Sequence, residues 1–336
     1  MLNEVKGQPD ALRLALNQKE EVHRLAGLLK NKKRILFMGM GSSYLALKAA
    51  QNYLSKRIPG TIDLVTAGDV IFYFDETKRY DLVIIASQSG ESIETLDAAR
   101  KLKEYGLEIW TITNTKDSSL YSLADEKLLM LAGREVTSAT KTYINLMALL
   151  FALGLTEGDP SWDDLLSIPS WMEACITECE KKAQQTAKEL HQEGIRNLYV
   201  LGMGPHLVTA GEAALLFKEK VWLCTEGMNT AEFRHGPVEV IENGVGVFIL
   251  GGNPEVEKFS LLVAKDLQSK GARVYFIGSD SESQGRVGYI NCSCPNEEYL
   301  PFIQVIPFQF ISFFLALEKG MNVEGFRHIG KVINSY

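Results

Sequence analysis

The sequence predicts an α/β protein of two tandem, doubly wound parallel-sheet domains related by internal duplication. Short aliphatic segments alternate with amphipathic helical patterns along the whole chain. The pattern of the first half returns in the second half. The length of 336 residues suffices for two hydrophobic cores.

The first half shows the alternation most clearly. The aliphatic segments predicted as strands are Ile35–Met38, Ile62–Val65, Leu82–Ala86, Ile109–Thr113 and Lys127–Leu131. Helical patterns lie between several of them, for example at Ser43–Lys56 and Ile93–Tyr105. Strands that are apolar on both faces and alternate with helices indicate a parallel sheet covered by helices on each side.

The second half repeats three segments of the first half in the same order. Ile35–Gly41 returns as Leu198–Gly204, Val83–Ala86 as Val247–Leu250, and Tyr105–Trp110 as Lys270–Tyr275. The first residues of these pairs lie 163, 164 and 165 positions apart. Such a constant offset indicates two copies of one α/β unit.

The boundary between the copies is predicted within Thr156–Pro169, where glycine, aspartate and proline favour turns. This gives a first domain at residues 1–168 and a second domain at residues 169–336. A charged amphipathic helix is expected before each copy, at Pro9–Lys30 and at Ser170–Glu193.

Composition and charge exclude several classes of protein. Hydrophobic residues make up 46% and charged residues 23% of the chain, which is typical of globular domains. The net charge of −7 argues against nucleic acid or an anionic membrane as a partner, so an anionic substrate must be held by a local arrangement of donors. Met1–Glu21 lacks the apolar core of a signal peptide. Prolines and polar residues interrupt Leu300–Leu317, which favours a buried core helix over a membrane span.

The cysteines indicate neither disulfides nor a metal site. They are Cys175, Cys179, Cys224, Cys292 and Cys294. An odd number without a CxxC pair fits neither a disulfide framework nor a zinc site. Cys292 and Cys294 are expected on a strand, where they share a face. Free thiols are typical of the reducing cytoplasm, which is the predicted location.

Two loops combine glycine and hydroxyl side chains where strands lead into helices. Gly39–Ser43, which includes Gly41 and Ser42, follows the first strand, and Ser87–Ser92 follows the third. In an open parallel sheet, ligands bind beyond the carboxyl ends of the strands. Backbone amides, hydroxyls and the positive end of a helix dipole can bind a phosphate there. These serines can also serve as simple helix N-caps.

No cofactor is expected from the glycine pattern. Gly39-Met40-Gly41 lacks the third glycine of the dinucleotide fingerprint, and no complete phosphate-binding loop of the nucleotide-hydrolase type is present. The sequence therefore indicates an enzyme or binding protein that works without NAD or a nucleotide.

The segment Ser87-Gln88-Ser89-Gly90-Glu91-Ser92 resembles the phosphate loop of the sugar isomerase (SIS) domain, which has a flavodoxin-like fold. Over nearly the whole chain, the doubled arrangement resembles the isomerase half of glucosamine-6-phosphate synthase and the fructosamine-6-phosphate deglycases. The resemblance implies that a set of residues contacts the phosphate or hydroxyls of a sugar 6-phosphate. This set is Gly41, Ser42, Ser43, Ser87, Gln88, Ser89, Ser92 and Ser138. Ser138 lies in Thr137–Lys141, which matches a loop that closes over the sugar and is one residue shorter here.

Glu219 and His235 are candidates for acid–base catalysis. Glu219 lies near the end of the helix predicted at Glu212–Val221, and His235 follows sixteen residues later. Enolisation at C1 and C2 of a sugar needs a carboxylate base, and an imidazole can open the ring or transfer a proton. From residue types alone, a structural histidine and a solvated glutamate remain open.

The resemblance assigns roles to these two residues. Lys218-Glu219 and His235-Gly236-Pro237 match the family pattern at this spacing, which implies that Glu219 is the base and His235 the ring-opening or proton-transfer group. In the synthase the histidine reaches the neighbouring subunit's site. The resemblance therefore implies a homodimer or higher homo-oligomer with shared active sites.

The C-terminal tail matches the family pattern, whereas the N-terminus and position 216 differ from the synthase. Phe326–Val332 resembles the synthase tail, which implies that Lys331 faces the sugar carbonyl as a cation or Schiff-base amine. Read alone, it is a solvated surface charge. The chain begins Met1-Leu2, without the N-terminal cysteine of a glutaminase, and Leu216 stands where the synthase has a lysine. Glutamine is therefore not expected as the nitrogen donor.

The predicted function is processing of an amino-substituted sugar 6-phosphate at C1 and C2 by Glu-mediated enolisation. Either fructosamine-6-phosphate deglycation or isomerisation with deamination fits this prediction. The segment Ala231–Pro237 is closer to the deglycases, whereas the serine loop and lysine tail are closer to the synthase. The alternatives are a simple aldose–ketose isomerase and a non-catalytic sugar-phosphate-binding regulator.

Overall fold

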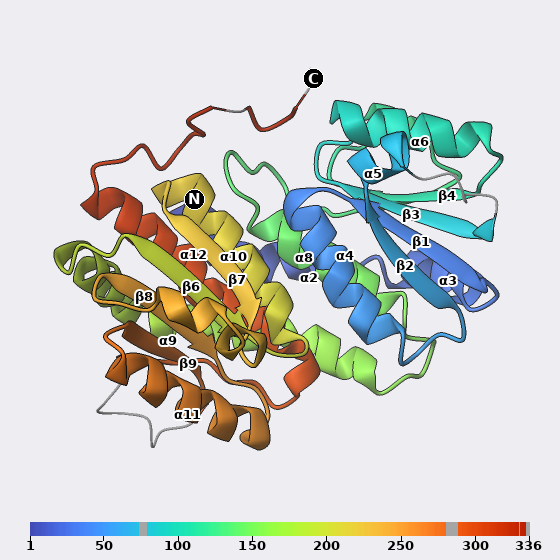
Figure 1. Ribbon diagram of the computed structural model, residues 1–336. Coiled ribbons are helices and arrows are strands. Elements are labelled where there is room, and N and C mark those ends of the chain that lie inside the picture. The colour runs from blue at the N-terminus through green and yellow to red at the C-terminus, as the bar shows by residue number, and fades with distance from the viewer. Residues whose placement is uncertain (74–78, 280–287, 329, 334–336) are drawn as a thin grey trace. The chain divides into compact units, whose positions relative to one another are not determined.

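The computed structural model describes residues 1–73, 79–279, 288–328 and 330–333, and it divides into two compact units (Figure 1). The first unit comprises Gly7–Ser167 and Phe326–Tyr336, and the second comprises Met1–Lys6 and Ile168–Gly325. The division lies one residue from the predicted boundary, but each terminal segment belongs to the opposite unit from the one predicted. Ile329, within the tail motif, lies outside the described residues.

The first unit is built on a parallel sheet of the order β2-β1-β3-β4-β5. Its strands are β1 (Arg34–Gly39), β2 (Thr61–Thr66), β3 (Leu82–Ser87), β4 (Ile109–Thr113) and β5 (Glu126–Leu129). Its helices are α2 (Gln8–Leu16), α3 (Lys19–Leu29), α4 (Gly41–Leu54), α5 (Ala67–Phe72), α6 (Ile93–Glu104), α7 (Ser119–Leu123) and α8 (Lys141–Ala152). The predicted strands and parallel sheet are confirmed.

Helices cover both faces of this sheet, as the apolar strands require. Leu36 and Met38 of β1 and Val83 and Ile85 of β3 pack in one cluster with residues of α5, α6 and α7. Helices α4 and α8 lie on the other face, where α4 contacts β1, β2 and β3 (Figure 1). All six residues of β3 are buried, because this strand lies inside the sheet and under helices on each side.

The second unit repeats the sheet in the order β7-β6-β8-β9-β10. Its strands are β6 (Asn197–Gly202), β7 (Cys224–Asn229), β8 (Val245–Leu250), β9 (Arg273–Gly278) and β10 (Gly288–Asn291). Its helices are α1 (Leu2–Lys6), α10 (His206–Val221), α11 (Pro254–Ser269) and α12 (Leu300–Glu318). Because the strand order matches that of the first unit position by position, the predicted duplication is confirmed at the level of topology.

The apolar segment Leu300–Leu317 lies in helix α12 and forms the core of the second unit with α10. Phe308 of α12 packs edge-on against Phe217 of α10 and Phe248 of β8, with ring centroids 6.3 Å and 5.3 Å apart. Among the described residues, this is the one helix long and apolar enough to cross a membrane, and 89% of its most apolar stretch is buried inside the protein. The prediction of a buried core helix is confirmed.

One predicted helix and the predicted boundary segment differ from the structure. Pro9–Lys30 is broken into α2 and α3 at Asn17, and Gln18 donates its side-chain amide to the carbonyl of Leu129 at 2.8 Å. The segment Thr156–Pro169, predicted to contain the boundary in turns, is partly helical instead, because α9 (Ser161–Gln192) begins within it and contains Pro169.

The burial pattern explains why α9 continues through a proline. The buried side chains at its start recur every three or four residues, at Trp162, Leu165, Ile168 and Met172. This apolar stripe gives the helix a face to bury, which outweighs the backbone hydrogen bond that proline removes.

A buried histidine joins the carboxyl end of the second sheet to α12. The ring nitrogens of His206 lie 2.8 Å from Oε1 of Gln304 and 3.3 Å from Oε1 of Glu297. Gln304 in turn donates to the carbonyl of Gly251 at 2.8 Å. The hydrogen bond from His206, helped by Asn253, lowers the pKa of the Glu297 carboxyl to about 2.

Gly227→Ala is expected to destabilise the second unit. A Cβ at Gly227 of β7 would lie 2.5 Å from the carbonyl oxygen of Ala210, a backbone atom of α10 that cannot move alone. Overpacking of this kind costs about 1–3 kcal/mol, which a lower urea midpoint would reveal. Gly27→Ala in α3 is the matched control, because nothing lies within 4 Å of its added Cβ. Equal midpoints for the two variants would contradict the prediction.

Glu297 is expected to make stability depend on pH in the acid range. Its folded pKa of about 2 lies below the ordinary value of 4.5, so the charged form is stabilised by folding. The contribution is complete above pH 4.5 and is lost as the pH falls towards 2. Because the side chain is 34% exposed and solvent screens its charge, we expect this contribution to the free energy of unfolding to be about 1 kcal/mol. Urea unfolding should show that wild type has a higher free energy of unfolding than Glu297→Gln, and that this difference becomes smaller below pH 4.5. A difference that does not change with pH would contradict the assignment.

Candidate functional site

The candidate site lies at the carboxyl edge of the first sheet, where the strand order reverses. β1 pairs in parallel with β2 on one side and β3 on the other. The loops that leave β1 and β3 therefore start side by side at the topological switch point, where open α/β sheets bind ligands. Gly41, Ser42 and Ser43 begin α4 directly after the first loop, and Ser87–Ser92 run from the last residue of β3 through the second loop. The structure thus brings these sequence-predicted groups together.

The β1 loop leads into α4 with an N-terminus that no side chain caps. The N-cap residue, Met40, has an extended backbone and an apolar side chain that cannot accept the amides of the first turn. Gly41 is exposed, and Ser42 and Ser43 are half-buried in this first turn. Such an end presents amides, hydroxyls and the positive end of the helix dipole to an anion.

The β3 loop is a compact turn whose serines accept backbone hydrogen bonds. Oγ of Ser87 accepts from the amide of Gly90 at 3.1 Å, and Oγ of Ser89 accepts from the amide of Glu91 at 3.2 Å. A hydroxyl that accepts still has its own O–H to donate. Ser92 is the N-cap of α6 and its side chain forms no capping bond. Three serine hydroxyls therefore remain able to donate to a phosphate.

Gly90 and Glu91 fix the shape and the charge balance of this loop. Gly90 has φ of +67°, and a Cβ there would lie 2.3 Å from Oγ of Ser118. Only glycine fits this position. The carboxylate of Glu91 accepts from the amide of Ser119 at 2.7 Å, at the start of α7. Its negative charge is thereby paired with a helix N-terminus.

A third loop, residues 134–140, follows β5 and carries Ser138. The hydroxyls of Thr137 and Ser138 are buried and have no hydrogen-bond partner among the described residues. Two buried hydroxyls without partners are costly unless a ligand or water satisfies them. This supports a binding role for the loop.

The C-terminal tail packs on the first unit and places Lys331 at this third loop. Nζ of Lys331 donates to the carbonyl of Thr137 and lies 3.2 Å from Oε2 of Glu135. The carbonyl of Ile333 accepts from the amide of Ile93, the first residue of α6. The structure therefore brings Lys331 to the loop that carries Ser138. The position of Lys331 in the sequence did not indicate this contact.

Glu135 was missed by the sequence reasoning. It is buried and accepts hydrogen bonds from the loop and from the first turn of α8. No local pattern marks it, because its partners at Thr140, Thr142 and Lys331 lie 5, 7 and 196 residues away.

Glu219 and His235 lie in the second unit. Glu219 is half-buried in the last turn of α10, between exposed Lys218 and buried Lys220. His235 is exposed between two short 3-10 helices, η2 (Glu232–Arg234) and η3 (Pro237–Val240). Leu216 is buried one turn before Glu219. Both residues belong to the second unit, whereas the serine loops and Lys331 belong to the first unit.

The second unit has its own cavity of about 310 Å³ at the carboxyl edge of its sheet. Its lining includes Gly252 and Asn253, which follow the third strand of this sheet, and the carboxylates of Glu257 and Glu297. Glu257 accepts from the amide and hydroxyl of Ser279 at 2.7 Å and 2.9 Å. This edge therefore offers acceptors where the first unit offers donors, and it does not suit a phosphate.

The cysteines do not form a second site. All five are free thiols, as predicted. Cys292 and Cys294 follow β10 rather than lie on it, because the strand ends at Asn291. Burial and neighbouring thiols raise the pKa of Cys292 and Cys175, which makes both sulfurs poor nucleophiles. Among the described residues, no group of three or more His, Cys, Asp or Glu is arranged to hold a metal ion.

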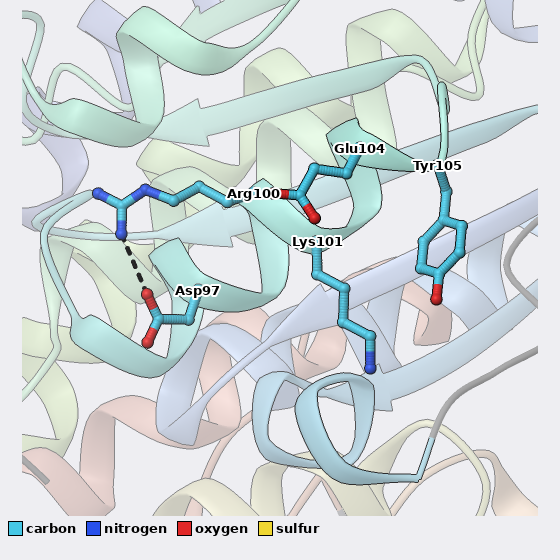
Figure 2. A pocket seen from close by; sticks show the side chains of 5 residues that line it. All are labelled: Asp97, Arg100, Lys101, Glu104 and Tyr105. Atoms are coloured by element: carbon cyan, nitrogen blue, oxygen red, sulfur yellow. Dashed lines mark hydrogen bonds and ion pairs between the residues drawn. The ribbon is translucent and has the colours of Figure 1, made fainter.

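A further hollow of about 560 Å³ lies along α6 (Figure 2). Arg100 donates to Asp97 at 3.0 Å, and Lys101 donates to the carbonyls of Val70 and Ile71. The Lys101 contacts join α6 to α5, and the Arg100–Asp97 pair lies within α6, so these charges are used within the fold. We therefore assign this hollow a structural rather than a binding role.

Comparison with known proteins shows similarity to sugar isomerase domains and to aminotransferases that act on sugar phosphates. Residues 28–153 match the SIS domain model. The chain is 28% identical over 352 residues to glutamine–fructose-6-phosphate aminotransferase (isomerizing) of Thermococcus kodakarensis, and 29% identical over 349 residues to that of Pyrococcus horikoshii. Each alignment covers 99% of this chain and 57% of the relative. The chain thus spans a little over half the length of these relatives.

Solved structures share the fold over nearly the whole chain. The C-terminal domain of glucosamine-fructose-6-phosphate aminotransferase from Francisella tularensis superimposes with a TM-score of 0.86 at 22% identity, covering 96% of this chain and 97% of that domain. Glucosamine-6-phosphate deaminase from Thermotoga maritima gives a TM-score of 0.79 at 22% identity and covers 99% and 98% of the two chains. Residues 28–153 thus match the SIS domain model, and the whole chain shares the fold of the aminotransferase's C-terminal domain.

Proposed function

We propose that this protein is an enzyme that acts at C1 and C2 of an amino-substituted sugar 6-phosphate, as a fructosamine-6-phosphate deglycase or an amino-sugar-phosphate isomerase and deaminase. The observation that carries the proposal is the donor-rich pair of loops at the switch point of the first sheet. Ser87 and Ser89 accept from their own loop and keep their O–H groups for a phosphate. The similarity to phosphosugar enzymes supports the same substrate class.

The proposed chemistry needs only proton transfers. A carboxylate, Glu219, removes a proton from C1 of the ketoamine. The electrons of that C–H bond form the C1–C2 double bond, and the C2 carbonyl oxygen takes up a proton from His235 or water, which gives an enaminol. Return of a proton to C2 gives an imine at C1, and water adds to the imine and releases the amine. The products are an aldose 6-phosphate and the free amine. His235 opens the sugar ring or moves the proton between oxygens. A positioned acid or base of this kind contributes about 10²–10⁴ in rate.

We also propose a homo-oligomer in the cytoplasm. His235 lies exposed on a short turn, so it is accessible to a neighbouring subunit. The five free thiols support a reducing location. In this proposal the loops after β1 and β3 bind the phosphate, the group that all sugar 6-phosphates share.

Glu219→Gln tests the proposed base. Wild type should exchange the C1 or C2 proton of a substrate for deuterium in D₂O, whereas the amide of the variant cannot take a proton. We expect exchange, followed by NMR with fructosamine 6-phosphates, glucosamine 6-phosphate and fructose 6-phosphate, to slow by about 10²–10⁴. Glu226→Gln, which changes an exposed carboxylate on β7, is the matched control. Undiminished exchange in Glu219→Gln would remove Glu219 from the mechanism.

Gly90→Ala tests the phosphate loop. The added Cβ would lie 2.3 Å from Ser118 at φ of +67°, so the loop must change shape and its donors must move. Each hydrogen bond to a charged group contributes about 1.5–3 kcal/mol, so fructose 6-phosphate should bind at least about tenfold more weakly by calorimetry. Gly106→Ala is the control, because φ there is also positive, at +76°, but nothing lies within 4 Å. Equal affinity of the two variants would show that the loop does not bind the phosphate.

A further inference from the structure

Glu135 is a buried carboxylate that joins three segments of the first unit. Its Oε1 accepts from the amide and hydroxyl of Thr140 at 2.8 Å and 2.9 Å. Its Oε2 accepts from the hydroxyl of Thr142 at 2.6 Å and lies 3.2 Å from Nζ of Lys331. The loop, the first turn of α8 and the C-terminal tail thus meet at one side chain.

The two charged side chains differ in their exposure to solvent. The Glu135 side chain is 0% exposed and that of Lys331 is 25% exposed. A carboxylate taken out of water is tolerated only with hydrogen bonds and a positive partner, and here α8 and Lys331 supply both. Lys331 keeps part of its surface in contact with solvent, so it can meet a ligand while Glu135 cannot.

The contact with Glu135 places the Lys331 ammonium beside hydroxyl groups of the loop. Its ammonium also donates to the carbonyl of Thr137, beside the buried hydroxyls of Thr137 and Ser138 that lack partners among the described residues. An ammonium and two hydroxyls form a donor set that suits the oxygens of a sugar. A lysine side chain has four flexible bonds, so without an anchor its ammonium would sample many positions.

We propose that Glu135 is a positioning residue that holds the Lys331 ammonium beside Thr137 and Ser138, and thereby fastens the C-terminal tail to the loop that faces the sugar. This deepens the proposed function and rests on it for the identity of the ligand. The carbonyl of Ile333, which accepts from the amide of Ile93, fastens the tail at a second point, next to the β3 loop. The tail thus links the loop after β5 with α6, the helix that follows the phosphate loop.

The first test measures the lysine directly and needs no substrate. Brief acetylation with acetic anhydride, read by mass spectrometry, gives the reactivity of Lys331 relative to exposed Lys30 in the same sample. Glu135→Gln should raise the relative reactivity of Lys331 at least about fivefold, the factor that corresponds to an ion pair of about 1 kcal/mol. Glu135→Asp, which keeps the charge, should restore most of the protection.

Glu126→Gln is the matched control, because it breaks an ion pair with Arg24 elsewhere in the same unit. Unchanged Lys331 reactivity in Glu135→Gln, or the same rise in Glu126→Gln, would overturn the proposal. This outcome does not depend on turnover, so it is distinct from a failure of the proposed function, in which wild type would process no sugar phosphate.

The second test uses turnover and guards against a misfolded Glu135 variant. Lys331→Met removes the ammonium from the tail, while Glu135 keeps its hydrogen bonds from Thr140 and Thr142. We expect each single change to lower kcat/KM by about 10–10², and the double change Glu135→Gln with Lys331→Met to cost no more than the larger single effect. Additive losses would mean that Glu135 acts separately from Lys331 and would contradict the proposal.

Discussion

The parallel pairing of β1 with both of its neighbours determines where this protein can hold an anion. Gly39 pairs with Thr66 of β2, and Met38 pairs with Ile85 of β3, so the strands end at a common edge. The loops after β1 and β3 have to diverge from that edge into α4 and α6. Their first turns therefore present amide and hydroxyl donors to the same space. The donor-rich site follows from the sheet and not from a basic surface, which a chain of net charge −7 does not provide.

Local pairing of carboxylates makes this edge compatible with an anion. The carboxylate of Glu91 is held at the start of α7, and that of Glu135 is held at the start of α8 and against Lys331. Each negative charge is thus met by a helix N-terminus or a cation close by. The loops keep their glutamates without placing an unpaired negative charge beside the serine hydroxyls.

Duplication preserved the sheet and let the loops diverge. Both sheets have the same strand order, since buried aliphatic strands can be exchanged only for others of similar size and shape. The loop after the third strand carries three serines in the first unit. In the second unit the corresponding loop, at Gly252 and Asn253, lies beside the carboxylates of Glu257 and Glu297. Loops carry little of the packing energy, so the two copies were free to acquire opposite hydrogen-bonding character.

The sequence by itself determined the two sheets, the duplication, the buried helix α12 and the loops after β1 and β3. These depend on aliphatic periodicity and on residues that are neighbours along the chain. It did not determine that α9 continues through Pro169, because that depends on which face the helix buries. Nor did it determine that the tail packs on the first unit or that Glu135 holds Lys331. Only the tertiary structure decided these contacts, since a carboxylate and an ammonium 196 residues apart are brought together by chain topology, and no local spacing records it.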